Sequence, residues 1–187
     1  MTSILTFDTS TRAGWAYFSG PRAARPIFDT IRLPIADKDD YAARTWPLMQ
    51  AAEALVAKFE PDVMGFEAPF IPWGNSDLGT SGQTVRLQIL LAGVIELVAK
   101  KHGITRCIEA TTQECKKAMT GHGAIPKAVK ATLRKQEDRR KWWKHQMVAA
   151  CHARRWMVQD DNQGDAVAVG VVVYDVLGTP VDLALTV

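Results

Sequence analysis

The sequence predicts an α/β fold in which helices cover both faces of a mixed sheet of five strands. Five short segments rich in β-branched and aromatic residues are separated by Gly, Pro and polar breaks, a pattern typical of strands. Longer segments repeat their apolar residues about every 3.6 positions, which is typical of helices. Three strands come first and helices and strands then alternate, so we expect the order βββαβαβα.

The first half of the chain is expected to contain four strands and one helix. A meander of three strands is predicted in short apolar segments between turn-forming residues, at 3–7, 13–18 and 27–33. Residues 39–59 have helical apolar spacing, and Pro61 ends this helix. Residues 63–67 form a short apolar segment that suits a strand in the middle of the sheet.

The second half is expected to be mostly helical. A loop with Gly, Pro and Asn at 68–82 precedes a long apolar helix at 83–103, and residues 104–110 form the last strand. The remaining helices are a short one opened by Thr111 or Thr112, a basic stretch from Pro126 to about Met157, and a final one from about Asn162.

Composition and charge exclude several classes of protein. The 187 residues are 47% hydrophobic and 23% charged, the balance of one globular domain over residues 1–187 rather than of a disordered, fibrous or coiled-coil chain. The formal net charge of +3 does not by itself indicate a polyanionic partner. Between Lys127 and Arg155, however, ten Lys and Arg residues accompany only two acidic ones, and such a local excess attracts phosphate groups.

The cysteines and the N-terminus indicate a reducing compartment. Cys107, Cys115 and Cys151 are odd in number and have no CxxC spacing, so neither a disulfide framework nor a zinc site is expected. The start of the chain lacks the basic and apolar regions of a secretory signal, and no apolar run approaches the roughly 18 residues of a membrane span. We therefore expect a cytoplasmic protein with no membrane partner.

Acidic residues are placed where predicted strands end. Asp8 follows the strand at 3–7 and Glu67 ends the strand at 63–67, and ligands often gather at such strand ends. Before the last helix, Asp161 and Asn162 lie four and three positions before Asp165, on the same helical face. Oxygen ligands without His or Cys suit Mg²⁺ or Mn²⁺. Two such ions, about 4 Å apart, can activate water and stabilise a leaving oxygen.

Each of these residues also has a purely structural interpretation. Asp8 can form a turn with the residues after it, and Asp160 and Asp161 are suited to cap the last helix. Glu67 is harder to explain in this way, because an unpaired carboxylate after an apolar strand is costly without a cation. Asp165, at the head of a strongly apolar helix, is the better metal-ligand candidate of the last group.

Four segments resemble, in order, the motifs of RuvC-type Holliday junction resolvases: ILTFDTSTRAGWAYF, GFEAPF, CKKAMTGHGAIPK and DNQGDAVAV. The resemblance implies a ribonuclease H-like fold. It also implies an endonuclease that resolves four-way DNA junctions with two Mg²⁺ (or Mn²⁺) ions per active site. It assigns metal-binding roles to Asp8, Glu67 and Asp165. The family usually has Asp three residues before the last acid, where this chain has Asn162 with Asp161 beside it, so either residue is a candidate fourth ligand.

The resemblance also assigns DNA-contacting residues. Lys116 and Lys127 correspond to basic residues near the scissile phosphate, with Lys127 expected closest to the metals, where it can stabilise developing charge. Phe70 corresponds to an aromatic residue that stacks on an unpaired base, although a core position is an equal alternative, and Trp73 is a second candidate. His122 is a further candidate for phosphate contact.

A DNA-backbone face is expected along the basic stretch, which is longer here than in bacterial members of the family. Its residues are Lys127, Lys130, Arg134, Arg139, Arg140, Lys141 and Lys144. Lys117, which follows Lys116, is a separate DNA-binding candidate. Trp142 and Trp143 are expected in the core or at an interface. The resemblance further implies a homodimer, because two symmetric nicks are needed, with the contact through the apolar helix at 86–98.

Three other interpretations are kept open. ILTFDTST also resembles the opening of the actin-like ATPase fold, although the later glycine-rich loop of that class is not found. A junction-binding protein that lost catalysis through Asn162 is a non-enzymatic alternative. A related nuclease that acts on other branched or flapped DNA is the third.

Overall fold

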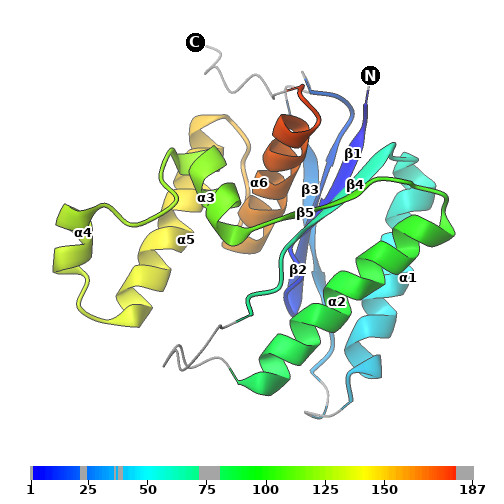
Figure 1. Cartoon of the computed structure of the whole chain (residues 1–187), viewed down its shortest axis with the longest axis horizontal. Helices are drawn as coiled ribbons and strands as arrows, with labels where there is room; N and C mark the ends of the chain where they lie inside the picture. Colours follow the sequence, from blue (N-terminus) through cyan, green and yellow to red (C-terminus); the bar gives the residue numbers. More distant parts are fainter. Residues whose placement is uncertain (1, 22–24, 36, 38–39, 72–80, 180–187) are drawn as a thin grey trace.

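Five strands form one mixed sheet in the order β3-β2-β1-β4-β5 (Figure 1). The computed structural model describes residues 2–21, 25–35, 37, 40–71 and 81–179. In the sheet, β2 pairs antiparallel with both β1 and β3, whereas β4 runs parallel to β1 and to β5. The strands are β1 (Ile4–Phe7), β2 (Arg12–Phe18), β3 (Ile27–Arg32), β4 (Val63–Glu67) and β5 (Cys107–Ala110). The predicted α/β fold with a mixed sheet is therefore confirmed.

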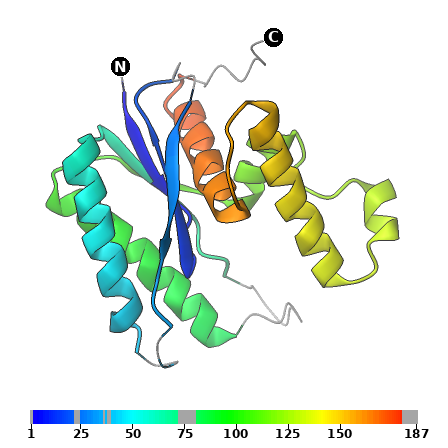
Figure 2. The same ribbon diagram turned by 180° about the vertical axis from the view of Figure 1, so that it is seen from behind.

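Helices cover both faces of this sheet (Figure 2). The helices α1 (Ala42–Phe59) and α2 (Gly82–Lys101) pack on one face. On the other face lies α6 (Asp161–Val176), with α3 (Thr112–Thr120) and α5 (Gln136–Ala153) packed against it. The short helix α4 (Lys127–Thr132) contributes no buried residue and lies away from the sheet (Figure 1).

The central strand β1 is buried on both sides, as the continuous apolar sequence predicts. Leu5 and Phe7 belong to the core under α1 and α2, and Ile4 belongs to the core under α6. Thr6 is also buried, and its hydroxyl donates a hydrogen bond to the Ala166 carbonyl of α6 at 2.7 Å. Alternation along one strand thus joins both helical layers to the sheet.

Small residues allow α6 to lie directly on the sheet. A Cβ at Gly170 would come within 2.2 Å of the Phe18 ring on β2, so only glycine permits this approach. The start of α6 is capped by Asp160, whose carboxylate accepts a hydrogen bond from the Gln163 amide at 3.0 Å. Near its other end, the Tyr174 hydroxyl donates to the Thr2 carbonyl. The helix is therefore fixed at both ends.

Several expected boundaries were wrong. The basic helical stretch from Pro126 to Met157 is two helices, α4 and α5, because α4 buries nothing that would hold a continuous helix and Lys135 is extended. The helix expected from residue 39 begins at Ala42, and the strand expected from residue 104 begins at Cys107. Thr111 is the cap that opens α3, where it forms a reciprocal capping box with Glu114.

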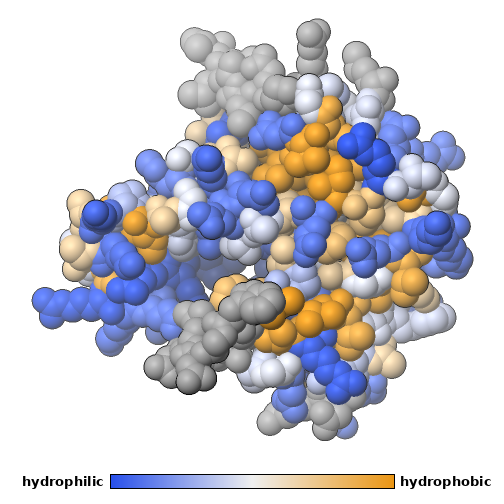
Figure 3. Space-filling model, viewed as in Figure 1, coloured by the Kyte–Doolittle hydropathy of each residue, from blue (hydrophilic) through white to orange (hydrophobic). Residues whose placement is uncertain are grey.

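The helix α2 presents an apolar outer surface. Among the described residues, it is the one helix that is long and apolar enough to cross a membrane, and 39% of its apolar segment is buried. Core helices of soluble proteins have the same length and composition. Its buried side packs on β4 and α1, whereas Ile89, Leu90 and Leu97 are exposed by 47%, 38% and 67%. Hydrophobic side chains accordingly gather over α2 in Figure 3, and hydrophilic ones over α3.

Candidate active site

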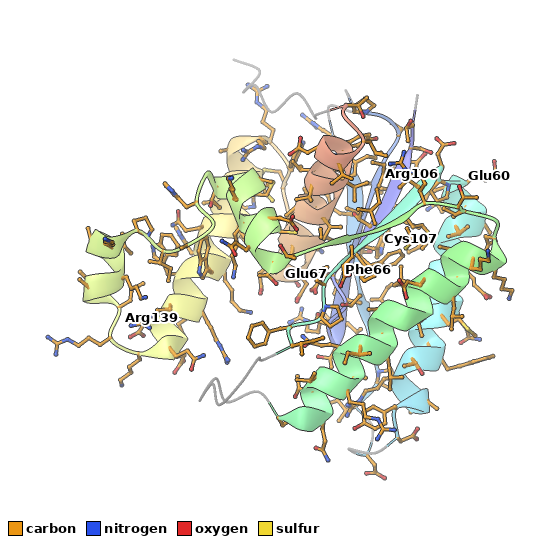
Figure 4. The ribbon with its side chains drawn as sticks, in the orientation of Figure 1. Glu60, Phe66, Glu67, Arg106, Cys107 and Arg139 are labelled. Atoms are coloured by element: carbon orange, nitrogen blue, oxygen red, sulfur yellow. The ribbon has the colours of Figure 1, made fainter. Side chains whose placement is uncertain are left out.

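Asp8 and Glu67 are neighbours because of strand register. The parallel pairing of β1 with β4 matches Phe7 with Phe66, so the next residue on each strand falls at the same end of the sheet. Asp8 is buried, and its amide donates to the Gly14 carbonyl at 2.9 Å. Figure 4 shows Glu67 at this end of β4, beside α3. The sheet thus presents two carboxyl groups at one place.

The third acid, Asp165, comes from α6. The hydrogen bond between Thr6 and the Ala166 carbonyl fixes this turn of α6 on β1, and Asp165 is the residue before it. The charge of Asp165 raises the pKa of Asp8, and the charge of Glu67 raises the pKa of both residues. The structure therefore brings together the three acids that the sequence analysis singled out.

Hydrogen bonds orient two of these carboxylates. The hydroxyl of Ser10, two residues after Asp8, donates a hydrogen bond to Asp8 Oδ2 at 2.9 Å. The Thr112 hydroxyl on the first turn of α3 donates to Glu67 Oε1. In each carboxylate the second oxygen takes no part in this hydrogen bond. Sequence analysis missed both residues, since a Ser or Thr near an acid is common and only the folded chain shows its direction.

The pKa values indicate an excess of buried negative charge. Burial, followed by the charges of Glu67 and Asp165, raises the pKa of Asp8 well above its ordinary value. Burial, Glu67 and Asp161 likewise raise the pKa of Asp165. Burial also raises the pKa of Glu67, although the Thr112 hydrogen bond and the charge of Lys116 act in the opposite direction. A bound cation would relieve this repulsion.

The donor chemistry of the site suits a hard divalent cation. Three carboxylates and the nearby Asn162 amide are oxygen donors of the type that Mg²⁺ and Mn²⁺ prefer. In the described ranges, no group of three or more His, Cys, Asp or Glu side chains is arranged so that it could hold a metal ion as the structure stands. The oxygen chemistry of the donor set nevertheless fits the implied metals, and the charge repulsion among the three acids is the feature of the structure that supports this fit.

Asp161 and Asn162 differ in their surroundings. The Asp161 carboxylate forms an ion pair with Lys144 of α5, with Oδ2 and Nζ 2.6 Å apart. The Asn162 side-chain oxygen instead faces the Ser10 hydroxyl at 3.4 Å, on the side of Asp8. Of the two candidate fourth ligands, Asn162 is therefore linked to Asp8 through the Ser10 hydroxyl, whereas Asp161 has a cationic partner and its charge still acts on Asp8 and Asp165.

The structure places Lys116, not Lys127, beside the acids. The charge of Lys116 lowers the pKa of both Glu67 and Asp165, and that of Lys144 lowers the pKa of Asp165. Lys127 is the exposed first residue of α4, the helix that lies away from the sheet (Figure 1). The expectation that Lys127 is the lysine closest to the carboxylates was therefore wrong, because the chain leaves the site through the loop after α3.

The other predicted DNA-contacting residues are on the surface. Phe70 is 44% exposed, so it is a surface residue and not a core residue. Arg139 lies in the first turn of α5, away from Glu67 (Figure 4), and its Nε donates to the Leu133 carbonyl in the connection to α4. Trp73 lies outside the described residues. The remaining residues are exposed: Lys117, His122, Lys130, Arg134, Arg140 and Lys141.

A cavity of about 190 Å³ adjoins the acids between α3, α5 and α6. Its lining includes Asp161 and Asp165, the lysines Lys116 and Lys144, and Trp143. Trp142 and Trp143 are half-buried and in mutual contact, with ring centroids 4.8 Å apart. The sequence had placed Trp143 in the core or at an interface, whereas the structure also places it in the wall of this cavity.

The sheet order, the helices on both faces and the carboxylates at the strand ends are those of a ribonuclease H-like fold. No family model matches the sequence, and no curated protein matches it. Among solved structures, the chain is similar to RuvC from Thermus thermophilus. The similarity to that protein in complex with a Holliday junction substrate has a TM-score of 0.62 at 14% identity and covers 96% of this chain and 98% of that one.

Two further solved structures are similar. Another structure of Thermus thermophilus RuvC has a TM-score of 0.61 at 15% identity, again over 96% of this chain and 98% of that one. The yeast mitochondrial Holliday junction resolvase has a TM-score of 0.47 at 10% identity, over 90% of this chain and 77% of that one. The RuvC comparisons confirm the predicted ribonuclease H-like fold.

Proposed function

We propose that this protein is a structure-specific endonuclease that resolves four-way DNA junctions. It hydrolyses phosphodiester bonds in pairs, in two strands of like polarity, and depends on a divalent metal. One observation carries this proposal: Asp8, Glu67 and Asp165 are remote in sequence but share one partly buried site at the end of the sheet, where their charges act on one another. The fold of RuvC, a protein seen with a Holliday junction substrate, supports it.

In the proposed mechanism, Asp8, Glu67 and Asp165 would hold Mg²⁺ or Mn²⁺, with Asn162 as a neutral fourth ligand. Two such ions would supply an activated water and stabilisation of the leaving oxygen. Ser10 and Thr112 keep the Asp8 and Glu67 carboxylates oriented.

Lys116 has a separate role in this mechanism. Its ammonium lies near Glu67 and Asp165, where it offsets their charge and meets a non-bridging oxygen of the scissile phosphate. Lys127 starts an exposed helix, so its place is on the DNA backbone outside the catalytic centre.

Junction recognition is assigned to exposed residues around the site. Phe70 follows Glu67 by three residues and is proposed to stack on an unpaired base, a contact that any sequence allows. The phosphate backbone is contacted by the basic face of α3 to α5, where hydrophilic side chains dominate the surface (Figure 3). Its members are Lys117, His122, Lys127, Lys130, Arg134, Arg139, Arg140 and Lys141.

The protein is proposed to act as a homodimer. Two symmetric cuts need two active sites, and a twofold protein matches the symmetry of a four-way junction. The exposed residues Ile89, Leu90 and Leu97 on α2 provide an apolar surface for the partner copy. This surface lies on the face of the sheet opposite to α6.

A second candidate function is junction binding without cleavage. The observation that favours it is the weak fourth ligand: Asn162 supplies no charge, and Asp161 is paired with Lys144 at 2.6 Å. Such a protein would bind the same junction and leave it intact in Mg²⁺ and in Mn²⁺.

The test is cleavage of labelled DNA by the purified protein. A mobile four-way junction, a Y-fork and a linear duplex are each incubated with Mg²⁺, Mn²⁺ or chelator. We expect paired nicks in opposite arms of the junction, only with metal. Equal cutting of the linear duplex would contradict the proposal, and binding without cutting would support the second candidate.

Two variants connect this activity to the site. Asp8→Asn and Glu67→Gln are expected to abolish cleavage and to keep junction binding, since they remove metal-binding charge and preserve shape. Glu109→Gln on the adjacent strand β5 is the matched control, because it makes the same chemical change at an exposed position. Cleavage that survives Asp8→Asn and Glu67→Gln would show that these acids are not the metal ligands.

A further inference from the structure

The cavity between α3, α5 and α6 combines positive charge with carbon surface. Lys116, Arg140 and Lys144 line it from two helices, and Trp143 and Met147 add an aromatic and an aliphatic wall. Trp143 and Met147 come from α5, which carries none of the acids at the end of the sheet. The cavity is therefore a compartment beside the metal-binding acids, and Asp161 and Asp165 border it.

The charges in this cavity are unevenly paired. Lys144 is neutralised by Asp161 at 2.6 Å. Within the part of the chain that the structure describes, Lys116 and Arg140 have no carboxylate at ion-pair distance. Two cationic groups are thus available to an anion that enters the cavity.

Trp143 fixes one of these two cations. The Lys116 ammonium lies over the Trp143 ring, 4.8 Å from its centroid, in a cation–π contact. This contact directs Lys116 from α3 across the cavity towards α5. The remaining edge of the ring and the Met147 side chain offer apolar surface beside the same cations.

We propose that this cavity binds a single nucleotide of the cleaved DNA strand, next to the bond that is cut. Its phosphodiester group contacts Arg140, its sugar or base packs against Trp143 and Met147, and Lys116 stays with the adjoining scissile phosphate. This inference rests on the proposed function, because the cavity adjoins Asp165 of the catalytic group. A volume of about 190 Å³ suits the inserted part of one nucleotide and is too small for a duplex.

The first experiment measures binding without cleavage. The short strand d(TpTpT) is titrated in chelator into the full chain, and the indole N–H signal of Trp143 is followed by NMR. This signal is assigned from its loss in Trp143→Phe. We expect a saturable shift, with an affinity that falls about ten-fold in Arg140→Gln because one charged phosphate contact is lost.

The matched control is Lys135→Gln. Lys135 lies in the same basic stretch, directly before α5, and carries a positive charge, but it is exposed and does not line the cavity. We expect this variant to bind d(TpTpT) within two-fold of the wild type. An equal loss in the two variants would overturn the proposal, since it would show only general attraction to the basic surface.

A second experiment locates the nucleotide on the junction. A neutral methylphosphonate replaces one phosphate at a time on either side of the cut, and junction binding is measured in chelator. At one position we expect an approximately ten-fold loss for the wild type and no further loss for Arg140→Gln. The same loss in both proteins at every position would overturn the proposal.

These outcomes separate the nucleotide site from the nuclease. If d(TpTpT) shifts the Trp143 signal and Arg140→Gln lowers the affinity for d(TpTpT), the cavity binds a nucleotide even when no DNA is cut. If the junction is cut but the Trp143 signal does not move, the nucleotide site is refuted and the proposed nuclease stands.

Discussion

The backbone carbonyl of Asn162 lies directly against Gly14. A Cβ at position 14 would stand 2.0 Å from the Asn162 oxygen and 2.4 Å from its carbonyl carbon. The first turn of α6 therefore approaches β2 more closely than any residue with a side chain permits. The distance between Asp8 and the polar side chains on the first turns of α6 depends on this contact.

Gly14→Ala is expected to damage both stability and the site. Because the obstacle is backbone, α6 must shift, and we expect a loss of about 1–3 kcal/mol in the free energy of unfolding. Cleavage of the junction should fall as well. Urea unfolding measures the first effect and the nuclease assay the second.

Gly93→Ala is the control for this change. Gly93 lies inside α2, and a Cβ there meets nothing within 4 Å. Alanine favours helix over glycine, so this variant should gain roughly 0.5–1 kcal/mol. A Gly14→Ala protein as stable as the wild type would contradict the close contact between β2 and α6.

A comparison of Lys116→Gln with Lys127→Gln tests which lysine serves catalysis. Lys116 acts on Glu67 and Asp165, whereas Lys127 is exposed on α4. We expect kcat to fall on the order of 100-fold for Lys116→Gln, as for the loss of one stabilising donor, and little for Lys127→Gln. Single-turnover cleavage at saturating protein gives both values. The reverse order would restore the assignment suggested by the family resemblance.

The placement of the three acids at the ends of strands and at the head of a helix could be predicted from the sequence because it follows from local pattern. A charged residue after a buried strand, as with Asp8 and Glu67, is visible in the chain, and parallel register then brings strand ends together. Asp165 is visible in the same way, at the head of an apolar helix. The strands of the sheet were predicted for the same reason.

The cationic side of the site could not be predicted in this way. The contacts of Lys144 with Asp161 and of Lys116 with Trp143 depend on how α5 packs against α3 and α6. A basic stretch has no apolar pattern that fixes such packing, and the break between α4 and α5 was missed for the same reason.

Divalent metal is expected to stabilise the folded protein without DNA. A cation bound only by the native state adds about 2.7 kcal/mol at one hundred times its Kd. Thermal unfolding in Mg²⁺, Mn²⁺ or chelator measures this gain. Asp165→Asn should lose most of it, and Glu109→Gln should keep it.

The same Asp165→Asn variant has an opposite effect in chelator. Burial and the charge of Glu67 penalise the ionised Asp165 carboxylate and raise its pKa, so a neutral amide should make the metal-free protein more stable. A variant that is less stable than the wild type in chelator would show that the charge repulsion is absent.

The Asp62 carboxylate joins β1 to β4 in a pH-dependent way. It accepts hydrogen bonds from the Ser3 amide at 2.7 Å and from the Ser3 hydroxyl at 3.0 Å, and these bonds lower the pKa of Asp62. A lowered native pKa means that the unfolded chain binds more protons, so this stabilisation is present above the ordinary pKa of about 3.9. It is lost as the pH falls through the native pKa.

Asp62→Asn should therefore remove part of the acid dependence of stability. Urea unfolding in chelator between pH 6 and about pH 3 is expected to show the two proteins converging as the pH falls. Ser3→Ala should weaken the same dependence through loss of the hydroxyl donor. A constant difference between wild type and Asp62→Asn over this range would argue against an ionised acceptor.

Leu97→Glu is expected to convert a dimer into a monomer. Leu97 is 67% exposed on α2, so the charge costs little in the isolated chain but opposes burial against a second copy. Light scattering coupled to size exclusion should give twice the chain mass for the wild type and the single mass for the variant. Val176→Glu, at a 59% exposed position on α6, is the matched control and should stay dimeric.

The oligomeric state should also affect cleavage. In Leu97→Glu the paired nicks should become two uncoupled nicks. A wild type that is already monomeric would refute the proposed α2 interface.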